Sequence, residues 1–240
     1  MLVKACVNGG TTRKQHPAVP LTPAELAADA RAVVRAGAQA IHVHPRDAAG
    51  EQSLDAADVL PAVAAMRSSV PGTPIGVTTG IWAVDGDPER RLRLVAAWEG
   101  PGLPDFASVN LNEPGCDELA DLLSSLGIAI EAGVWVPEDA DRLAASTFAD
   151  RILRVLLEAE DETGPAAVET TAKIEATLER HGITAPTVAH GYGLATWDVI
   201  RRAIRTGRGF RIGLEDTTVL PDASPASSNT ELVAAAVALI

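Results

Sequence analysis

Short apolar segments alternate with longer amphipathic segments along the whole length of this chain. The short segments are rich in β-branched residues and are followed by turn-forming residues, which is typical of buried strands in a parallel sheet. The alternation therefore predicts a series of strand–helix units around such a sheet. The expected strands are Val3–Val7, Ala40–Val43, Ile75–Thr78, Phe106–Val109, Ile128–Ala132, Ile152–Leu156, Thr187–His190 and Phe210–Gly213.

An amphipathic segment with helical start signals follows each expected strand. The clearest begins at Thr22, with Pro23 at the first helical position and Glu25 completing a capping box, and it runs towards a stop at Gly37. Eight strand–helix units that close on themselves form a (β/α)8 barrel, the TIM barrel, whereas an open doubly wound sheet usually has fewer strands. We therefore expect an α/β protein with a single barrel domain over residues 1–240. The other helices are expected to begin near Leu54, Asp87, Gly115, Pro137, Gly164, Ala195 and Ser228.

The composition supports a large core and excludes some classes of partner. Hydrophobic residues make up 47% of the 240 residues, and many are Ala or Val, which suits small helices packed against a buried sheet. The formal net charge is −12 and no basic run occurs, so the surface should repel nucleic acid and anionic membranes. Because we find no membrane-spanning apolar stretch, no secretory signal and only two widely separated cysteines, we expect a cytoplasmic protein.

The sharpest local pattern is the segment 41–47, IHVHPRD. Side chains two residues apart on a strand point to the same side, so His42 and His44 should project together into the barrel mouth, where the active sites of this fold lie. Two imidazoles placed in this way form half of a metal site, which a carboxylate or another histidine would complete. Taken alone, such a pair is more often two histidines that hydrogen-bond loop backbone.

The segment 211–217, RIGLEDT, ends the last expected strand. Arg211 and Glu215 share one face by the same alternation, and Glu215 would supply the missing carboxylate of a zinc-type site that leaves coordination positions open for substrate. Asp216 is a candidate base or an orienting group for Arg211. The alternative is an exposed acidic pair that caps a helical turn. Combined with the histidine pair at another strand end, the metal site is the better interpretation.

Polar residues also end several other expected strands. Each of them alone is more often structural than functional. Their shared position at the carboxyl ends of the strands is what a barrel predicts for a site assembled from many loops. These residues are Thr78, Thr79, Ser108, Asn110, Glu131 and His190.

The chain resembles the β-keto acid cleavage enzymes essentially from end to end. The resemblance rests on VNGG at 7–10 followed by PLTPAE at 20–25, on AGA at 36–38 leading to HVHPRD at 42–47, and on RIGLED at 211–216. It implies a zinc-dependent reaction in which a β-keto acid and acetyl-CoA, as co-substrate, give acetoacetate and a new acyl-CoA. It also implies a homo-oligomer, either a tetramer or a dimer.

The resemblance implies roles for particular residues. The two histidines and the glutamate named above match the metal ligands, and the metal would polarise the substrate carbonyl as a Lewis acid. Arg211 and Asp216 match a pair that removes an α-proton from the keto acid, and Glu131 matches a residue that orients Arg211. Thr78 and Ser108 match hydroxyl positions near the substrate or the thioester.

The chain departs from the family pattern in ways that affect its substrate. It is shorter, mainly at the C-terminus and in the loops after the fourth and sixth strands, and those loops often help to enclose the coenzyme. The acidic residue that recognises an amino group after Asn-Gly is missing, because Gly10 leads directly into Thr11-Thr12-Arg13. We therefore expect a keto acid with a neutral or anionic tail, met by Arg13 or His190, rather than 3-keto-5-aminohexanoate. His190 is also a candidate for an additional acid or base.

Two other functions compete with this interpretation. One is a different metal-dependent barrel aldolase or hydrolase. Amidohydrolases also carry a His-x-His, but on the first strand and joined by later histidines, whereas this chain has only five histidines. The other is a non-catalytic barrel that binds a metal or a small acid, which would have no need of the proton-transfer residues.

Overall fold

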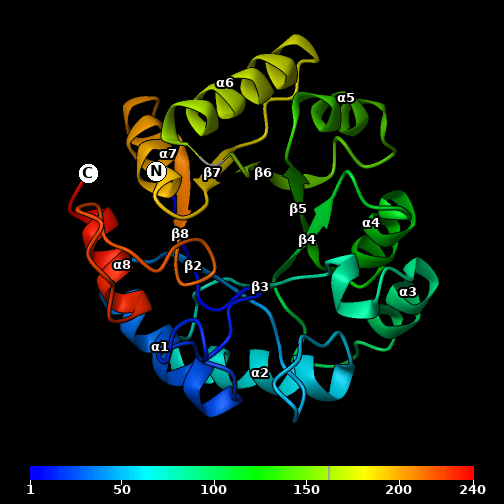
Figure 1. Ribbon diagram of the computed structural model, residues 1–240. Coiled ribbons are helices and arrows are strands. Elements are labelled where there is room, and N and C mark those ends of the chain that lie inside the picture. The colour runs from blue at the N-terminus through cyan, green and yellow to red at the C-terminus, as the bar shows by residue number, and fades with distance from the viewer. Residues whose placement is uncertain (162) are drawn as a thin grey trace.

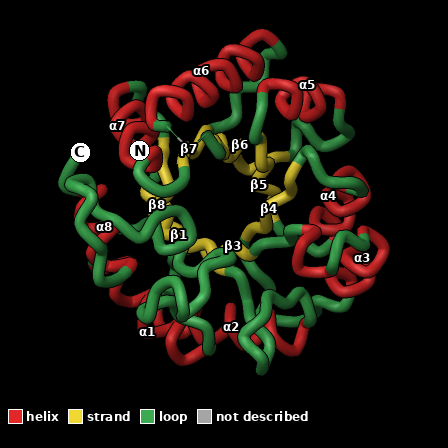
Figure 2. Tube along the Cα trace, in the orientation of Figure 1, coloured by secondary structure: helices red, strands yellow, loops and turns green. Residues whose placement is uncertain are grey.

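A computed structural model describes residues 1–161 and 163–240 of the chain. Eight parallel strands form a closed barrel in sequence order, and β1 pairs with both β2 and β8. Figure 1 shows the helices arranged around this barrel, and Figure 2 shows the ring of strands inside the ring of helices. The expected (β/α)8 fold is confirmed. The strands are β1 (Val3–Cys6), β2 (Ala40–Val43), β3 (Ile75–Val77), β4 (Phe106–Asn110), β5 (Ala129–Val134), β6 (Ile152–Ala159), β7 (Thr187–Gly191) and β8 (Gly209–Ile212).

A helix follows every strand, and most helices begin where the sequence signals place them. At the start of α1 the Thr22 hydroxyl accepts a 3.3 Å hydrogen bond from the Glu25 backbone N–H, and the Glu25 carboxylate accepts a 3.0 Å bond from the Thr22 N–H. This reciprocal pair is the capping box that the sequence predicts. The helices are α1 (Pro23–Arg35), α2 (Ala56–Ser69), α3 (Pro88–Ala96), α4 (Cys116–Ser125), α5 (Pro137–Ala145), α6 (Gly164–Arg180), α7 (Ala195–Arg205) and α8 (Asn229–Val237), with a short 3-10 helix η1 (Ile81–Val84) between β3 and α3.

The barrel interior contains a buried ionic cluster as well as apolar side chains. Glu131 on β5 accepts a hydrogen bond from Lys4 on β1 and another, 2.6 Å long, from Arg154 on β6. Burial opposes the ionised form of Glu131, but the two cations outweigh it and lower the pKa of this carboxyl to about 2. The guanidinium of Arg154 also lies 4.5 Å from the centre of the Phe106 ring. This cluster connects three strands inside the barrel.

No helix in the described part of the chain is both long and apolar enough to cross a membrane.

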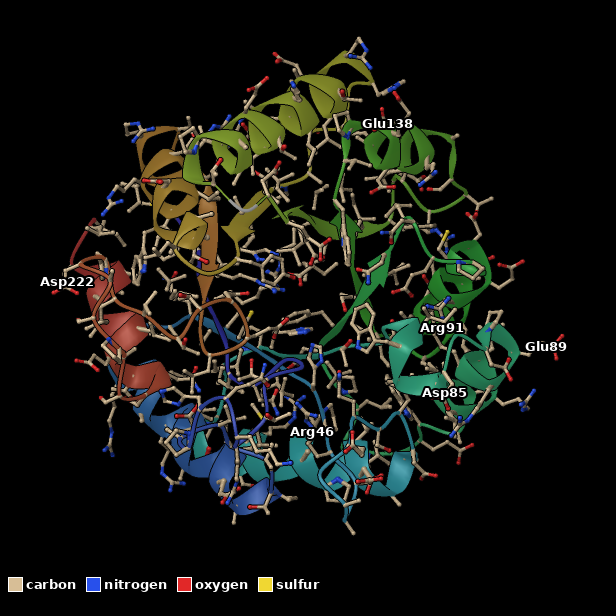
Figure 3. All side chains as sticks on the ribbon, in the orientation of Figure 1. Arg46, Asp85, Glu89, Arg91, Glu138 and Asp222 are labelled. Carbon is tan, nitrogen blue, oxygen red and sulfur yellow. The ribbon has the colours of Figure 1, made fainter. Side chains whose placement is uncertain are left out.

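Charged side chains lie both at the outer edge of the molecule and nearer the barrel axis. Glu89 and Asp222 lie at the outer edge of the molecule, whereas Arg46 lies closer to the barrel axis (Figure 3). Arg46 follows β2 and donates hydrogen bonds to the backbone oxygens of Gly9 and Gly50. It therefore connects the loops that follow β1 and β2.

Candidate metal centre and pocket

Three potential metal ligands converge at the carboxyl ends of β2 and β8. Nε2 of His42 lies 3.1 Å from Nε2 of His44, and the Glu215 carboxylate lies 4.0 Å from the first nitrogen and 3.5 Å from the second. One ligand atom from each residue can be chosen so that all lie within 4.8 Å of one another. His42 and His44 are buried, and the Glu215 side chain is 10% exposed. The structure thus brings together the three residues that the strand alternation places on one side.

Hydrogen bonds with the last residue of β1 and with the two residues after it hold these ligands in position. The N–H of Val7 donates to the carbonyl of His42, and the N–H of Glu215 donates to the carbonyl of Cys6. The side chain of Asn8 accepts a 2.8 Å bond from the His44 N–H and donates a 2.9 Å bond to the His44 carbonyl. The end of β1 and the residues just after it thereby fix the distance between the ligands carried by the two neighbouring strands and the loops that follow them.

Gly9 allows the close packing of Glu215 against the β1 loop. Its φ of +49° is in the left-handed region, which residues with a Cβ rarely adopt. A Cβ at this position would lie 2.2 Å from Cγ of Glu215. Only glycine therefore permits the observed position of the carboxylate without a shift.

The surroundings keep two of the three candidate ligands in the forms that bind metals. Burial holds the pKa of His42 well below its ordinary value, so the ring is neutral. Burial would raise the pKa of Glu215, but Arg211 and the two histidines hold it well below its usual range. Oε2 of Glu215 is buried and has no hydrogen-bond partner among the described residues. A neutral imidazole beside a carboxylate oxygen without a partner is the donor chemistry of a divalent metal site.

The orientation of His44 is set by Gln52, a residue that sequence reasoning did not identify. Nδ1 of His44 lies 2.5 Å from Oε1 of Gln52, and Trp82 Nε1 donates to the same oxygen over 3.0 Å. An amide oxygen only accepts hydrogen bonds, so Nδ1 of His44 carries the proton and Nε2 keeps its lone pair. The Trp82 ring is also stacked near the His44 ring, with 6.3 Å between centres.

Arg211 is buried beside the candidate ligands and is held by two carboxylates. Its Nε and Nη2 donate to Asp216 Oδ1 over 2.9 and 2.7 Å, and Nη2 also donates to Glu215 Oε1 over 2.9 Å. Burial opposes its charge, but Asp216 and Glu215 raise the pKa of Arg211 above its already high ordinary value. Burial raises the pKa of Asp216, although Arg211 counteracts this effect. His190 lies behind this pair, with Nδ1 3.4 Å from Asp216 Oδ1.

Among the described residues, no hydrogen bond joins Glu131 to Arg211, which the family resemblance implies that it orients. The two carboxylate oxygens of Glu131 are bonded to Lys4 and Arg154, inside the barrel. Asp216 takes the place beside Arg211 instead, because it follows the same strand and lies within reach of two guanidinium nitrogens. Of the two residues predicted to orient Arg211, Asp216 is the one that is hydrogen-bonded to it.

A cavity of about 390 Å³ opens beside the candidate metal ligands. Thr78, Ser108 and Asn110 line it, as predicted for residues at strand ends. Thr79 does not, because its hydroxyl donates to the backbone carbonyl of Ser108. Arg13 lies outside the cavity, where it pairs with Glu25 at the start of α1. The wall is completed by the following residues: Gly10, Thr11, Gln15, His42, His44, Gln52, Trp82, Trp135, Leu156, Glu158, Glu160, Tyr192, Arg211 and Glu215.

The acidic residues after position 157 have the composition of a solvated loop. Glu158 is nevertheless buried on β6 and lines the cavity together with Glu160. β6 continues to Ala159 and thus extends beyond the predicted end at Leu156. Side chains two positions apart on a strand point to the same side. The sequence spacing of Leu156, Glu158 and Glu160 therefore indicates that these three residues share one wall of the cavity. Glu162 lies outside the described residues.

Comparisons with known proteins agree with the barrel fold. A family model described as beta-keto acid cleavage enzyme matches residues 1–240. A curated relative, the 3-keto-5-aminohexanoate cleavage enzyme of Fusobacterium nucleatum, is 33% identical over 81 residues, which make up 33% of this chain and 30% of that protein.

Solved structures with the same fold include ObcA. Its apo form matches 91% of this chain and 61% of its own, with a TM-score of 0.73 and 19% identity. Its ternary complex with a C4-CoA adduct and oxalate gives a TM-score of 0.74, also at 19% identity. The 3-dehydroquinate dehydratase of Geobacillus kaustophilus matches 93% of this chain and 86% of its own, with a TM-score of 0.62 and 15% identity. This chain thus spans less than two thirds of ObcA and aligns with less than one third of the curated relative.

Proposed function

The chain belongs to the beta-keto acid cleavage enzyme family, and we propose from this that it cleaves a β-keto acid at a zinc ion held by His42, His44 and Glu215. The observation that carries the proposal is the convergence of three ligand atoms within 4.8 Å. Two ligands of a tetrahedral zinc ion lie roughly 3.4 Å apart. The separations of 3.1, 3.5 and 4.0 Å between the candidate atoms therefore suit zinc.

A bound zinc ion would act as a Lewis acid towards the carbonyl and carboxylate oxygens of the keto acid. Three protein ligands leave coordination positions open for those oxygens. The cavity begins at the ligands, so a small keto acid can lie in it with its reactive end at the metal site. Arg211 adds a fixed positive charge to the same wall.

Arg211 and Asp216 are the residues that we assign to proton transfer. Arg211 lines the cavity, and two of its nitrogens are hydrogen-bonded to Asp216. As the substrate α-carbon gives its proton to a guanidinium nitrogen, a proton from the same guanidinium passes to Asp216. The outcome is a neutral Asp216 and an Arg211 that is still cationic, which agrees with the raised pKa values of both groups.

The second substrate in this proposal is acetyl-CoA. The deprotonated α-carbon attacks the acetyl carbonyl, the acetyl C–S bond breaks, and the coenzyme leaves as a thiolate. The thiolate then adds to the β-carbonyl of the keto acid, and the bond between the α- and β-carbons breaks. The products are a new acyl-CoA and acetoacetate, whose α-carbon takes back the proton held by Asp216. A cavity of about 390 Å³ can take the keto acid and the thioester end, while the rest of the coenzyme lies outside. ObcA, whose complexes include a C4-CoA adduct, supports a coenzyme A thioester as the partner.

Metal content tests the central claim. The protein is purified without added metal, beside a His42→Ala/His44→Ala double variant and a His181→Ala control, whose histidine lies at the surface against Asp141. We expect about one zinc per chain in the parent and the control and none in the double variant. The parent should then form acetoacetate from a panel of β-keto acids with acetyl-CoA. Absence of metal from the parent, even after zinc is added, would refute the site.

A further inference from the structure

The cavity has a second polar wall, on the opposite side of the barrel from the candidate metal ligands. His42 and His44 follow β2, and Glu215 follows β8. In the closed order of eight strands, β6 lies opposite β2. β4 lies opposite β8 in the same order, as Figure 2 shows. Asn110 ends β4 and Glu158 is near the end of β6. A substrate that places its keto acid end at the metal site therefore directs its tail towards Asn110 and Glu158.

Two hydrogen-bond acceptors meet on this wall without a donor between them. Gly133 on β5 lies between the two strands, and a Cβ there would lie 2.3 Å from Asn110 Oδ1 and 2.7 Å from Glu158 Oε1. Asn110 is 5% exposed and uses its Nδ2 to donate to Glu113 over 2.7 Å. Its Oδ1 receives no hydrogen bond from any described residue and lines the cavity. Because Gly133 has no side chain, these two oxygens occupy the space where its Cβ would lie and come close to each other.

The same wall carries negative charge with little to neutralise it. Glu160 follows Glu158 at strand spacing and lines the cavity. Among the described residues that line the cavity, Arg211 is the only Arg or Lys, and Asp216 and Glu215 already hold it. His190 Nε2 lies 3.3 Å from Oε2 of Glu158 and leaves Oε1 of that carboxylate facing Asn110.

We propose that Asn110, Glu158 and Glu160 form a subsite for a primary ammonium group on the tail of the β-keto acid. An ammonium group offers three N–H donors and no acceptor, so it satisfies both the amide oxygen and the carboxylate. A methyl group would leave these buried acceptors without partners, and a carboxylate would be repelled by them. This assignment rests on the proposed cleavage function. It differs from the sequence expectation of a neutral or anionic tail, which rested on the missing acidic residue after Asn8-Gly9 and named Arg13 or His190 as the residue that meets the tail.

Turnover of matched substrates tests the subsite. The zinc-loaded protein is given acetyl-CoA and β-keto acids of equal chain length that end in ammonium, methyl or carboxylate groups. We expect kcat/KM for the ammonium substrate to exceed that for the methyl substrate by roughly 100-fold, because a site that binds donors discriminates strongly against analogues without them. In Glu158→Gln and Asn110→Leu this ratio should fall at least tenfold. In the control Glu138→Gln, on the outer helix α5, it should not change. Equal kcat/KM values for the three substrates would overturn the proposal. So would an unchanged ratio of kcat/KM values in Glu158→Gln and Asn110→Leu.

A binding measurement separates this proposal from the cleavage function. Calorimetry on the protein as purified compares δ-aminovalerate, hexanoate and adipate, which have similar lengths and react with nothing in the assay. We expect the amino acid to bind at least tenfold more tightly than the other two, and the difference to disappear in Glu158→Gln. If no keto acid is cleaved but this preference holds, the subsite stands and the cleavage proposal fails. If keto acids are cleaved and no preference for the amino acid exists, the subsite is wrong.

Discussion

Gln52 holds His44 by a 2.5 Å contact between its Oε1 and the ring Nδ1, and the same oxygen accepts a hydrogen bond from Trp82. The amide thus selects the tautomer in which His44 Nε2 faces His42 and Glu215 with a free lone pair. Outer partners of this kind usually change metal affinity by 10- to 100-fold when they are removed. Gln52 therefore contributes to the metal site without contacting the ion.

Replacing Gln52 tests this dependence. We expect Gln52→Leu to weaken zinc binding by about 10-fold or more, because His44 loses the acceptor that fixes its tautomer. Gln52→Glu keeps an acceptor at the same position and should bind zinc at least as well as the parent. Competition with a fluorescent chelator measures both affinities. Equal affinities for the parent and the leucine variant would show that His44 is oriented in another way.

Arg211→Lys tests the proton-transfer assignment. A lysine ammonium cannot reproduce the two planar donors, Nε and Nη2, that bond Asp216. We expect kcat to fall by roughly 100-fold or more while zinc content stays at the parental level. Steady-state kinetics and metal analysis on the same preparation separate the two effects. A lysine variant that retains most of its kcat would contradict a role for the guanidinium in the proton step.

Gly9 and Gly10 form a matched pair for testing the position of Glu215. In Gly9→Ala the new Cβ would meet Glu215 Cγ at 2.2 Å, and the backbone would keep a positive φ. We expect loss of most of the bound zinc and a cost of about 1–3 kcal/mol in the free energy of unfolding. In Gly10→Ala the new Cβ has only Gln52 Nε2 near it, at 3.7 Å, so zinc content should not change. Metal analysis and urea unfolding give the comparison, and equal zinc content in the two variants would refute the packing argument.

Asp29 on α1 should make stability depend on pH. Burial raises the pKa of its carboxyl to about 6, although Asn229 Nδ2 donates a 2.8 Å hydrogen bond to it. Its ordinary pKa is 3.8, so the folded chain binds this proton more tightly than the unfolded chain does. The contribution of Asp29 to stability is therefore greatest below about pH 4 and declines as the pH rises to about 6.

Asp29→Asn removes this titration. We expect the free energy of unfolding at neutral pH to rise by on the order of 1–3 kcal/mol, and its decline between about pH 4 and 6 to become smaller. Urea unfolding across this range measures the effect, with the exposed Asp150→Asn as the control. Identical pH profiles for the parent and Asp29→Asn would show that Asp29 does not titrate as its burial indicates.

The sequence was sufficient to predict the barrel and the approach of the candidate metal ligands. Buried strands of a parallel barrel are short and apolar, and turns separate them from amphipathic helices, so their order can be read locally. Parallel strands also end at one face of the barrel. His42 and Glu215 could thus be expected to lie near each other, although they are far apart in the chain.

Side-chain partners were harder to predict because they depend on contacts between distant strands. Lys4 and Glu131 are 127 positions apart, and no local pattern identifies them as a pair. The acidic stretch that contains Glu158 resembles a loop in composition, but β6 continues through that residue and buries it. Arg13 could not be placed either, since its pairing with Glu25 depends on how the loop before α1 folds.

β1 pairs with β2 on one side and with β8 on the other. The two histidines belong to the β2 side and Glu215 to the β8 side, so the candidate ligands lie on both sides of the first strand, where the barrel closes. A chain that has formed only its earlier units has both imidazoles in place but no carboxylate beside them. The complete ligand set exists only after β8 has docked on β1, which is the strand pairing with the greatest separation in sequence. A metal bound there would stabilise only the finished ring. It would stabilise the pairing of β8 with β1, which closes the longest loop of the chain and therefore costs the most chain entropy.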